Sequence, residues 1–174
     1  MGRSRDLADG SYIADGSITQ ADLASGVAGT GPAFSAYSSA NQFPSSGTYT
    51  KVIFGTEVFD TNNCFSSSTF TPNVAGYYQV SASISMAADT GMTAGFILFY
   101  KNGASTLANI GSHVTGLSTV GYYVMSASGL VYMNGSTDYL EVYGVIIGTG
   151  TNRYFFLSQN NNPTVFTGAL VRAA

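Results

Sequence analysis

Few side chains in this sequence can act as a nucleophile, or as a general acid or base, at neutral pH. The chain of 174 residues contains a single histidine, His113, and a single cysteine, Cys64. A catalytic triad needs a base, a nucleophile and an orienting acid in a fixed arrangement. His113 lies in a predicted polar loop, and no serine or acid pattern accompanies it. We therefore predict that the protein is not an enzyme, and we expect Cys64 to be a buried, inert thiol.

The acidic side chains do not predict a metal site. Asp138 and Glu141 are near neighbours beside a predicted strand turn, where we expect both to be solvated. Asp89 lies in a predicted loop, but calcium takes about six to eight oxygen ligands and one carboxylate is too few. A lone cysteine does not indicate a metal cluster either. The sequence predicts no metal and no cofactor.

One set of polar and aromatic side chains suits hydrogen bonding to sugar hydroxyls. Arg153 and Tyr154 lie in a predicted loop, residues 148–163, that is rich in glycine, threonine and asparagine. Long loops on a rigid scaffold are where recognition residues concentrate. The alternative is that these loops only contact water. The candidate receptor-binding residues are Asp89, His113, Asn152, Arg153, Tyr154, Asn160 and Asn161.

Strands must position these residues, because strand periodicity dominates the sequence. Between residues 77 and 86, apolar side chains alternate with glutamine and serine. A period of two is typical of a strand, since successive side chains leave opposite faces of the pleat. We find no convincing helix. Further strand-like runs occupy residues 33–37, 52–59, 95–101, 105–110, 122–133, 139–147, 154–157 and 164–172.

The turns between these runs predict the architecture. Asn102-Gly103 and Asn134-Gly135 indicate tight hairpins whose central residues have positive φ. If the strands alternate in direction, these turns and segment 60–76 lie at the end that holds both termini. The opposite end then carries segments 38–51, 87–94, 111–121 and 148–163. Eight or so strands with this spacing predict an all-β sandwich or jelly roll.

Several predicted strands are apolar on both faces, including residues 96–100 and 142–147. A two-layer sandwich buries only the inner face of each sheet. Apolar outer faces would expose a larger patch than soluble monomers tolerate. We therefore expect self-association. The candidate interface or core residues are Tyr78, Val80, Phe96, Phe99, Tyr143 and Phe166.

Composition and charge limit the partners. Only 9% of the residues are charged and the net charge is −3, so we expect neither nucleic acid nor an anionic membrane surface as a partner. No apolar stretch approaches the roughly 18 residues of a membrane span, so no membrane insertion is expected. No apolar run follows the N-terminus to form an ordinary signal peptide. Residues 1–31 are too sparse in apolar side chains to order alone, which predicts an extended arm before one domain, residues 32–174.

Four stretches resemble the complement-one-q and tumour-necrosis-factor family. They are Pro-Ala-Phe-Ser-Ala-Tyr at 32–37, Phe-Thr-Pro-Asn-Val-Ala-Gly-Tyr-Tyr at 70–78, Leu-Phe-Tyr-Lys-Asn-Gly at 98–103 and Phe-Thr-Gly-Ala-Leu at 166–170. The match covers roughly residues 32–174 in the family's order. It implies a homotrimeric jelly-roll head, so that the candidate interface becomes a trimer interface. Animal members often follow a collagen stalk, but this chain has no Gly-X-Y repeat.

A second resemblance concerns residues 15–24, Asp-Gly-Ser-Ile-Thr-Gln-Ala-Asp-Leu-Ala, which look like linker repeats of bacteriophage fibre proteins. It implies a phage structural protein on the virion surface. We expect a capsid decoration (a cement protein or short head fibre), because an arm of this length reaches only on the order of 100 Å.

A phage structural protein is expected to bind other proteins of the particle. The arm is expected to bind phage capsid or tail proteins, and host-cell glycans are the candidate ligands of the head. The alternatives are a receptor-binding tail-fibre tip and a free lectin-like module. The candidate virion-anchoring residues are Arg3, Arg5, Leu7, Ile13 and Ile18.

Overall fold

The structure is a computed structural model that describes residues 31–89, 91–105, 111–116, 121–158 and 163–174. These residues form twelve strands and no helix. Consequently no helix that could cross a membrane occurs among them. In chain order the strands are β1 (Ala33–Tyr37), β2 (Thr50–Lys51), β3 (Thr56–Asp60), β4 (Phe65–Ser66), β5 (Thr69–Phe70), β6 (Ala75–Ala88), β7 (Met92–Lys101), β8 (Gly111–Thr115), β9 (Gly121–Asn134), β10 (Leu140–Gly148), β11 (Arg153–Phe155) and β12 (Val165–Ala173).

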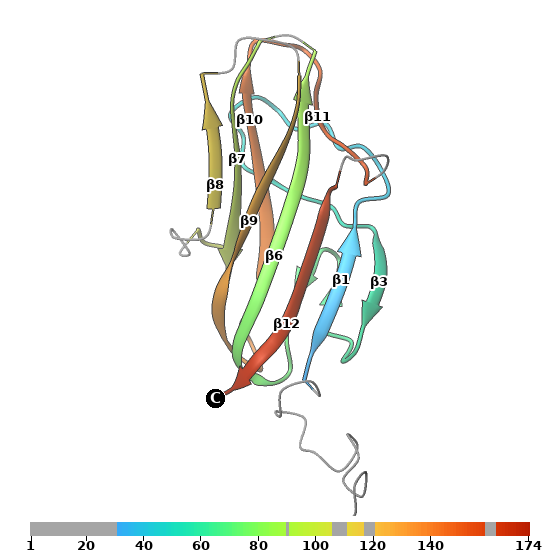
Figure 1. Cartoon of the computed structure of the whole chain (residues 1–174), viewed down its shortest axis with the longest axis vertical. Helices are drawn as coiled ribbons and strands as arrows, with labels where there is room; N and C mark the ends of the chain where they lie inside the picture. Colours follow the sequence, from blue (N-terminus) through green and yellow to red (C-terminus); the bar gives the residue numbers. More distant parts are fainter. Residues whose placement is uncertain (1–30, 90, 106–110, 117–120, 159–162) are drawn as a thin grey trace, which may run out of the picture.

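The strands form two antiparallel sheets packed as layers (Figure 1). In sheet A, β6 pairs with β9, β11 and β12, and β12 continues through β1 to β3. Sheet B has the order β4-β5-β10-β7-β8, with β2 also paired to β10. These pairings confirm the predicted all-β sandwich.

The strand β6 is the centre of sheet A, and its alternation separates core from surface. Tyr78, Val80 and Ile84 are fully buried between the sheets, whereas Gln79 and Ser81 are exposed on the other face. The ladder between β6 and β9 runs over the full length of both strands without a register shift. The long strand β6 therefore fixes the positions of the strands that pair with it, β9, β11 and β12.

The core between the sheets is a cluster of aromatic rings around Phe34 of β1. The Phe34 ring centroid lies 4.6 Å from that of Phe65, 4.5 Å from that of Phe70 and 4.8 Å from that of Phe166. Gly168 makes room for this ring, since a Cβ there would lie 2.7 Å from Phe34 Cε1. Four of the predicted interface or core residues are buried in this core, namely Tyr78, Val80, Phe99 and Phe166.

Two predicted segments differ from the structure. The run 52–59 is not one strand, because the chain passes there from β2 in sheet B to β3 in sheet A. Val52 and Phe54 are buried along this crossing, which explains their apolar character. The weak strand predicted at 105–110 falls mostly outside the described residues. The strand in this region is β8, so the predicted loop 111–121 was wrong.

The chain reversals gather at two ends of the sandwich. The start of β1 and the C-terminus lie at one end, the lower end of Figure 1, which we call the basal end. The connections that follow β6 and β10 lie at the opposite, distal end. There the backbone N–H of Asp89 donates to the Asn152 carbonyl at 3.0 Å, and that of Thr149 donates to the Gly91 carbonyl at 3.3 Å. The predicted distal segments 87–94 and 148–163 are thus neighbours.

Candidate functional site

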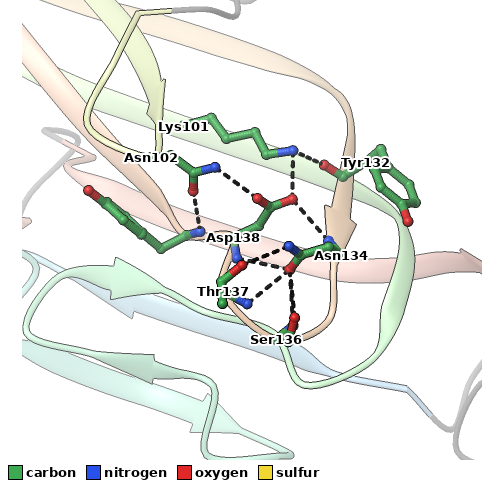
Figure 2. A network of polar contacts seen from close by, with 8 residues as sticks. Lys101, Asn102, Tyr132, Asn134, Ser136, Thr137 and Asp138 are labelled. Carbon is green, nitrogen blue, oxygen red and sulfur yellow. Dashed lines mark hydrogen bonds and ion pairs between the residues drawn. The ribbon is translucent and has the colours of Figure 1, made fainter.

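Asp138 is the centre of a polar network at the basal end (Figure 2). Its Oδ2 accepts hydrogen bonds from Lys101 Nζ at 2.7 Å and from the Asn134 backbone N–H at 3.0 Å. Its Oδ1 accepts from Asn102 Nδ2 at 2.8 Å. The prediction that Asp138 is solvated was wrong, since the residue is only 8% exposed. The carboxylate instead joins the hairpin after β7 to the connection between β9 and β10.

The environment of Asp138 keeps its carboxyl group ionised. Burial opposes ionisation, but hydrogen bonds from Asn102, Lys101 and the Asn134 N–H, together with the Lys101 charge, outweigh it. The pKa of Asp138 is therefore lowered from its ordinary value. Lys101 Nζ also donates to the Tyr132 carbonyl at 2.7 Å. These contacts connect the turn after β7 to the connection after β9. We call this network the basal clip.

The two Asn-Gly turns that flank this clip have different geometry. Asn102 and Gly103 have φ values of 54° and 77°, as predicted. Gly135 has φ 71°, but Asn134 is not among the residues with positive φ, so the prediction for Asn134 was wrong. The Asn134 side-chain carbonyl instead accepts from the backbone N–H groups of residues 136–138 at 2.9 to 3.0 Å. This oxygen closes a wider loop than a two-residue hairpin.

Glu141 is also paired rather than solvated, and its predicted environment was wrong. Its Oε1 accepts from Lys51 Nζ at 2.7 Å. Lys51 Nζ also donates to Thr69 Oγ1 at 2.7 Å, and that hydroxyl donates to Glu141 Oε1 at 3.2 Å. Sequence reasoning could not find this pair, because Lys51 is 90 residues away from Glu141.

Three tyrosines continue the outer face of sheet B beside this ion pair. The rings of Tyr100 and Tyr143 stack with centroids 4.0 Å apart and an interplanar angle of 26°. The Tyr49 ring centroid lies 6.3 Å from that of Tyr100. Tyr143 OH donates a long hydrogen bond to Glu141 Oε2 at 3.5 Å. Tyr143, a predicted interface or core residue, is therefore half-buried on an outer face and lies outside the core.

His113 lies in β8, so its predicted place in a loop was wrong. It pairs in register with Phe96 of β7, and the two rings stack with centroids 5.7 Å apart. Phe96, another predicted interface or core residue, is half-buried by this contact. His113 thus belongs to the outer face of sheet B and is not one of the distal loop residues.

The distal loops bring together several candidate receptor-binding residues. Asp89 Oδ2 accepts from Asn152 Nδ2 at 3.0 Å and from Thr151 Oγ1 at 3.1 Å. Arg153 Nε donates to the Pro44 carbonyl at 3.2 Å, which ties the loop after β1 to β11. Asp89 and Asn152 therefore lie in adjoining loops, whereas Arg153 and Tyr154, predicted in a loop, belong to β11.

Tyr154 belongs to a row of aromatic rings that the sequence analysis missed. Its ring centroid lies 5.2 Å from that of Phe43 and 5.4 Å from that of Phe156, which lies 5.1 Å from that of Tyr122. Knowledge of the strand pairing would have identified this row, because Tyr122 of β9 and Tyr154 of β11 both pair with Ala87 of β6. Two further candidates, Asn160 and Asn161, lie outside the described residues, as do the anchoring candidates Arg3, Arg5, Leu7, Ile13 and Ile18.

The outer face of sheet A exposes large apolar side chains at both ends of β9. Tyr122 is 69% exposed near the distal end, and Leu130 is 54% exposed toward the basal end. Ser126 and Ser128 lie between them on the same face. The exposed large apolar side chains of β6, β9 and β12 are Tyr77, Tyr122, Val124, Leu130, Tyr132 and Val171.

Cys64 is buried, as expected, and donates its thiol hydrogen to Asp60 Oδ1 at 3.2 Å. Burial, reinforced by the Asp60 carboxylate, raises the pKa of the Cys64 thiol to about 12. The reactive thiolate is therefore almost absent at neutral pH. In the part of the chain that the structure describes, no three His, Cys, Asp or Glu side chains could together hold a metal ion.

Comparisons with known proteins identify the fold. No protein-family profile and no curated protein matches the sequence. Among solved structures, the globular domain of zebrafish complement 1qA superposes with a TM-score of 0.53 at 17% identity, covering 82% of this chain and 99% of that chain. Murine APRIL at pH 5.0 superposes with a TM-score of 0.56 at 13% identity, covering 80% and 98%. At these identities the likeness shows the fold alone: the chain is a jelly roll of the complement-1q and tumour-necrosis-factor type.

Proposed function

We propose that the protein is a homotrimeric structural protein on the surface of a bacteriophage particle. Residues 32–174 form the exposed head, and residues 1–31 form the arm that attaches the head to the particle. The observation that carries the trimer is the apolar outer face of sheet A, defined by the exposed side chains of β6, β9 and β12. We propose a decoration of the capsid, and the alternative is a receptor-binding tail-fibre tip.

The outer face of sheet A is suited to a second copy of the chain. Among the described residues, this face exposes six large apolar side chains in two groups, one at each end of β9, and the centres of interfaces are enriched in aromatic side chains. Sheet B does not offer an equivalent surface, because Tyr100, Tyr143 and Phe96 are half-buried by their own ring contacts. The resemblance to complement-like heads supports three copies around an axis.

The particle role is supported by the linker resemblance of residues 15–24. The charged groups of the two ion pairs, Lys101 with Asp138 and Lys51 with Glu141, serve the fold. The distal loops face away from the end at which β1 begins (Figure 1). A head held by its basal end would therefore present Asn152 and Tyr154 outward, where host-cell glycans are the candidate ligands.

Light scattering on the full-length chain tests the trimer. We expect a mass near three times 18.1 kDa. The double variant Tyr122→Ser with Leu130→Ser removes two exposed apolar side chains from the sheet A face and should lower that mass. The matched control Tyr49→Ser changes an exposed ring on sheet B and should leave the mass unchanged. A monomeric wild-type chain would contradict the proposal.

Deletion of residues 1–28 tests the particle role. The truncated chain should remain a folded trimer but should no longer attach to phage particles. Decoration of particles by the truncated chain would show that the arm is not the anchor. A full-length chain that binds glycans but never attaches to particles would favour the free lectin-like module. Electron microscopy of labelled chain on particles would distinguish capsid decoration from a tail-fibre tip.

A further inference from the structure

We infer that the outer face of sheet B carries a binding site for a neutral carbohydrate. The site consists of Tyr49, Tyr100 and Tyr143 together with the Lys51–Glu141 ion pair, and we call this set the tyrosine platform. Tyr49 and Lys51 come from the predicted distal segment 38–51, but every member except Tyr49 lies on a strand of sheet B, and the set includes none of the predicted receptor-binding residues. The inference rests on the proposed function in one respect, since a trimer formed through sheet A leaves this face of sheet B on the outside.

Strand register places four members of the platform on one face of sheet B, and the ring contact between Tyr49 and Tyr100 places Tyr49 beside them. Tyr143 of β10 is directly opposite Lys51 of β2, and Glu141 is directly opposite Tyr100 of β7. Directly opposed residues share a face of the sheet, as do residues two apart in a strand. Val142, between Glu141 and Tyr143, is fully buried and points to the core. The platform is therefore fixed by three paired strands.

The rings of the platform suit the apolar face of a sugar. Tyr49 is 54% exposed, and Tyr100 and Tyr143 are half-buried behind it. A tyrosine offers an apolar ring with a hydrogen-bonding hydroxyl at its edge. A pyranose has the same division, with C–H groups on its faces and hydroxyls around its rim. The rigid Tyr100–Tyr143 stack, with its centroids 4.0 Å apart, would lose little conformational entropy on binding.

The ion pair supplies the polar half of the site and selects for a neutral ligand. Lys51 and Glu141 cancel each other's charge at 2.7 Å, so the pair offers neither anion nor cation attraction. An ammonium group has three N–H donors, and within the described residues Lys51 uses two of them, toward Glu141 and Thr69. Among the described residues, the one hydrogen-bond contact of Glu141 Oε2 is with Tyr143 OH at 3.5 Å, which is longer than a good hydrogen bond. One donor and one acceptor therefore remain beside the rings for sugar hydroxyls.

The experiment uses the purified full-length chain and its variants. An array of neutral and sialylated glycans should show binding to neutral glycans, and titration calorimetry with the best one gives its affinity. Tyr49→Ala should weaken that affinity about tenfold, because an exposed ring at the centre of a contact typically contributes that much. The matched control is Phe59→Ala, an exposed ring of β3 in sheet A, which should bind as the wild type does. Phe43→Ala removes a ring beside Tyr154 and therefore reports on binding at the distal loops instead.

A second variant tests the charge argument. Glu141→Gln keeps the side-chain shape but leaves the Lys51 charge uncompensated, so binding should shift from neutral toward anionic glycans. The site is overturned if no neutral glycan binds, if Phe43→Ala abolishes binding while Tyr49→Ala does not, or if the wild type prefers sialylated glycans. Light scattering on the same samples separates the two proposals. If the wild type is not trimeric but Tyr49→Ala still loses glycan binding, the trimer is wrong and the tyrosine platform stands.

Discussion

The basal and distal ends of the sandwich each hold an acidic side chain in a set of loop contacts, but the two sets differ in kind. Asp138 at the basal end is buried and pairs with the Lys101 ammonium at 2.7 Å. Asp89 at the distal end accepts from the neutral side chains of Thr151 and Asn152 in exposed loops. The basal contacts join the tight Asn102-Gly103 hairpin to the wider loop after β9 around a charge, whereas the distal contacts link the loops after β6 and β10.

This difference indicates that the basal end stabilises the fold, whereas the distal end presents side chains to the solvent. A buried ion pair with its hydrogen bonds satisfied is costly to break, because removing one partner leaves the other charge without compensation. At the distal end the donors to Asp89 are neutral and exposed, so these hydrogen bonds contribute less, since water can replace the donors. We therefore expect substitutions at the basal end to unfold the head and substitutions at the distal end to alter only its surface. All stabilities below are to be compared at one protein concentration, since association shifts apparent stability.

The largest effect is expected for Asp138→Ala. The variant leaves Lys101 and the Asn134 N–H without their partner, and we expect a loss of about 3 kcal/mol in the free energy of unfolding. Urea denaturation followed by circular dichroism measures it. Glu57→Ala, which removes an exposed acid in β3, is the control and should change stability by no more than about 0.5 kcal/mol. Equal effects of the two variants would remove the distinction between the ends.

Acid should weaken the basal end in a way that depends on Asp138. Because its folded-state pKa is lowered, the unfolded chain takes up the proton first as the pH falls. The stabilisation is complete above the ordinary carboxyl pKa of about 4 and is lost as the pH falls through the folded-state pKa. Asp60, whose pKa is also lowered, adds to the loss in the wild type. In Asp138→Asn the decline in stability below pH 4 should be shallower, and parallel curves would contradict this assignment.

A smaller effect is expected for Asn134→Ala. The variant removes the carbonyl that accepts three backbone N–H groups of residues 136–138, so we expect a loss of about 1 kcal/mol. Thr137→Ala, in the same loop, is the comparison: it removes only the hydroxyl that accepts from Asn134 Nδ2 at 2.8 Å and keeps the three backbone bonds, so its loss should be smaller. Thermal unfolding of both variants measures the difference. A loss as large as that of Asp138→Ala would mean that Asn134, not Asp138, organises the basal end.

The smallest effect is expected at the distal end for Asn152→Ala. The residue is exposed and donates one side-chain hydrogen bond, to Asp89, so the loss should be about 0.5 kcal/mol or less. The melting temperature should therefore remain close to that of the wild type. If Asn152→Ala destabilised the head as much as Asn134→Ala, the distal loops would have to be counted as part of the stable frame.

Much of the strand assignment could be predicted, because the alternation of β6, β9 and β12 reflects burial on one face. The break in the predicted strand 52–59 could not be predicted. Val52 and Phe54 are apolar because they are buried where the chain crosses between the sheets, and that crossing is a feature of the tertiary structure. The edge strand β8 was missed because its residues include few apolar side chains to mark a period.

The sequence alone determined that the chain is a β sandwich, because side-chain alternation is a local property of each strand. It also determined the Asn102-Gly103 hairpin, since both residues adopt the positive φ that this dipeptide favours. Only the tertiary structure decided which acids are solvated. Asp138 and Glu141 acquire Lys101 and Lys51 as partners through strand pairing, and such partners follow from topology rather than from the neighbouring residues. The same pairing stacks Tyr100 on Tyr143 and leaves Tyr122 exposed, so the surfaces that we propose for binding are products of the fold.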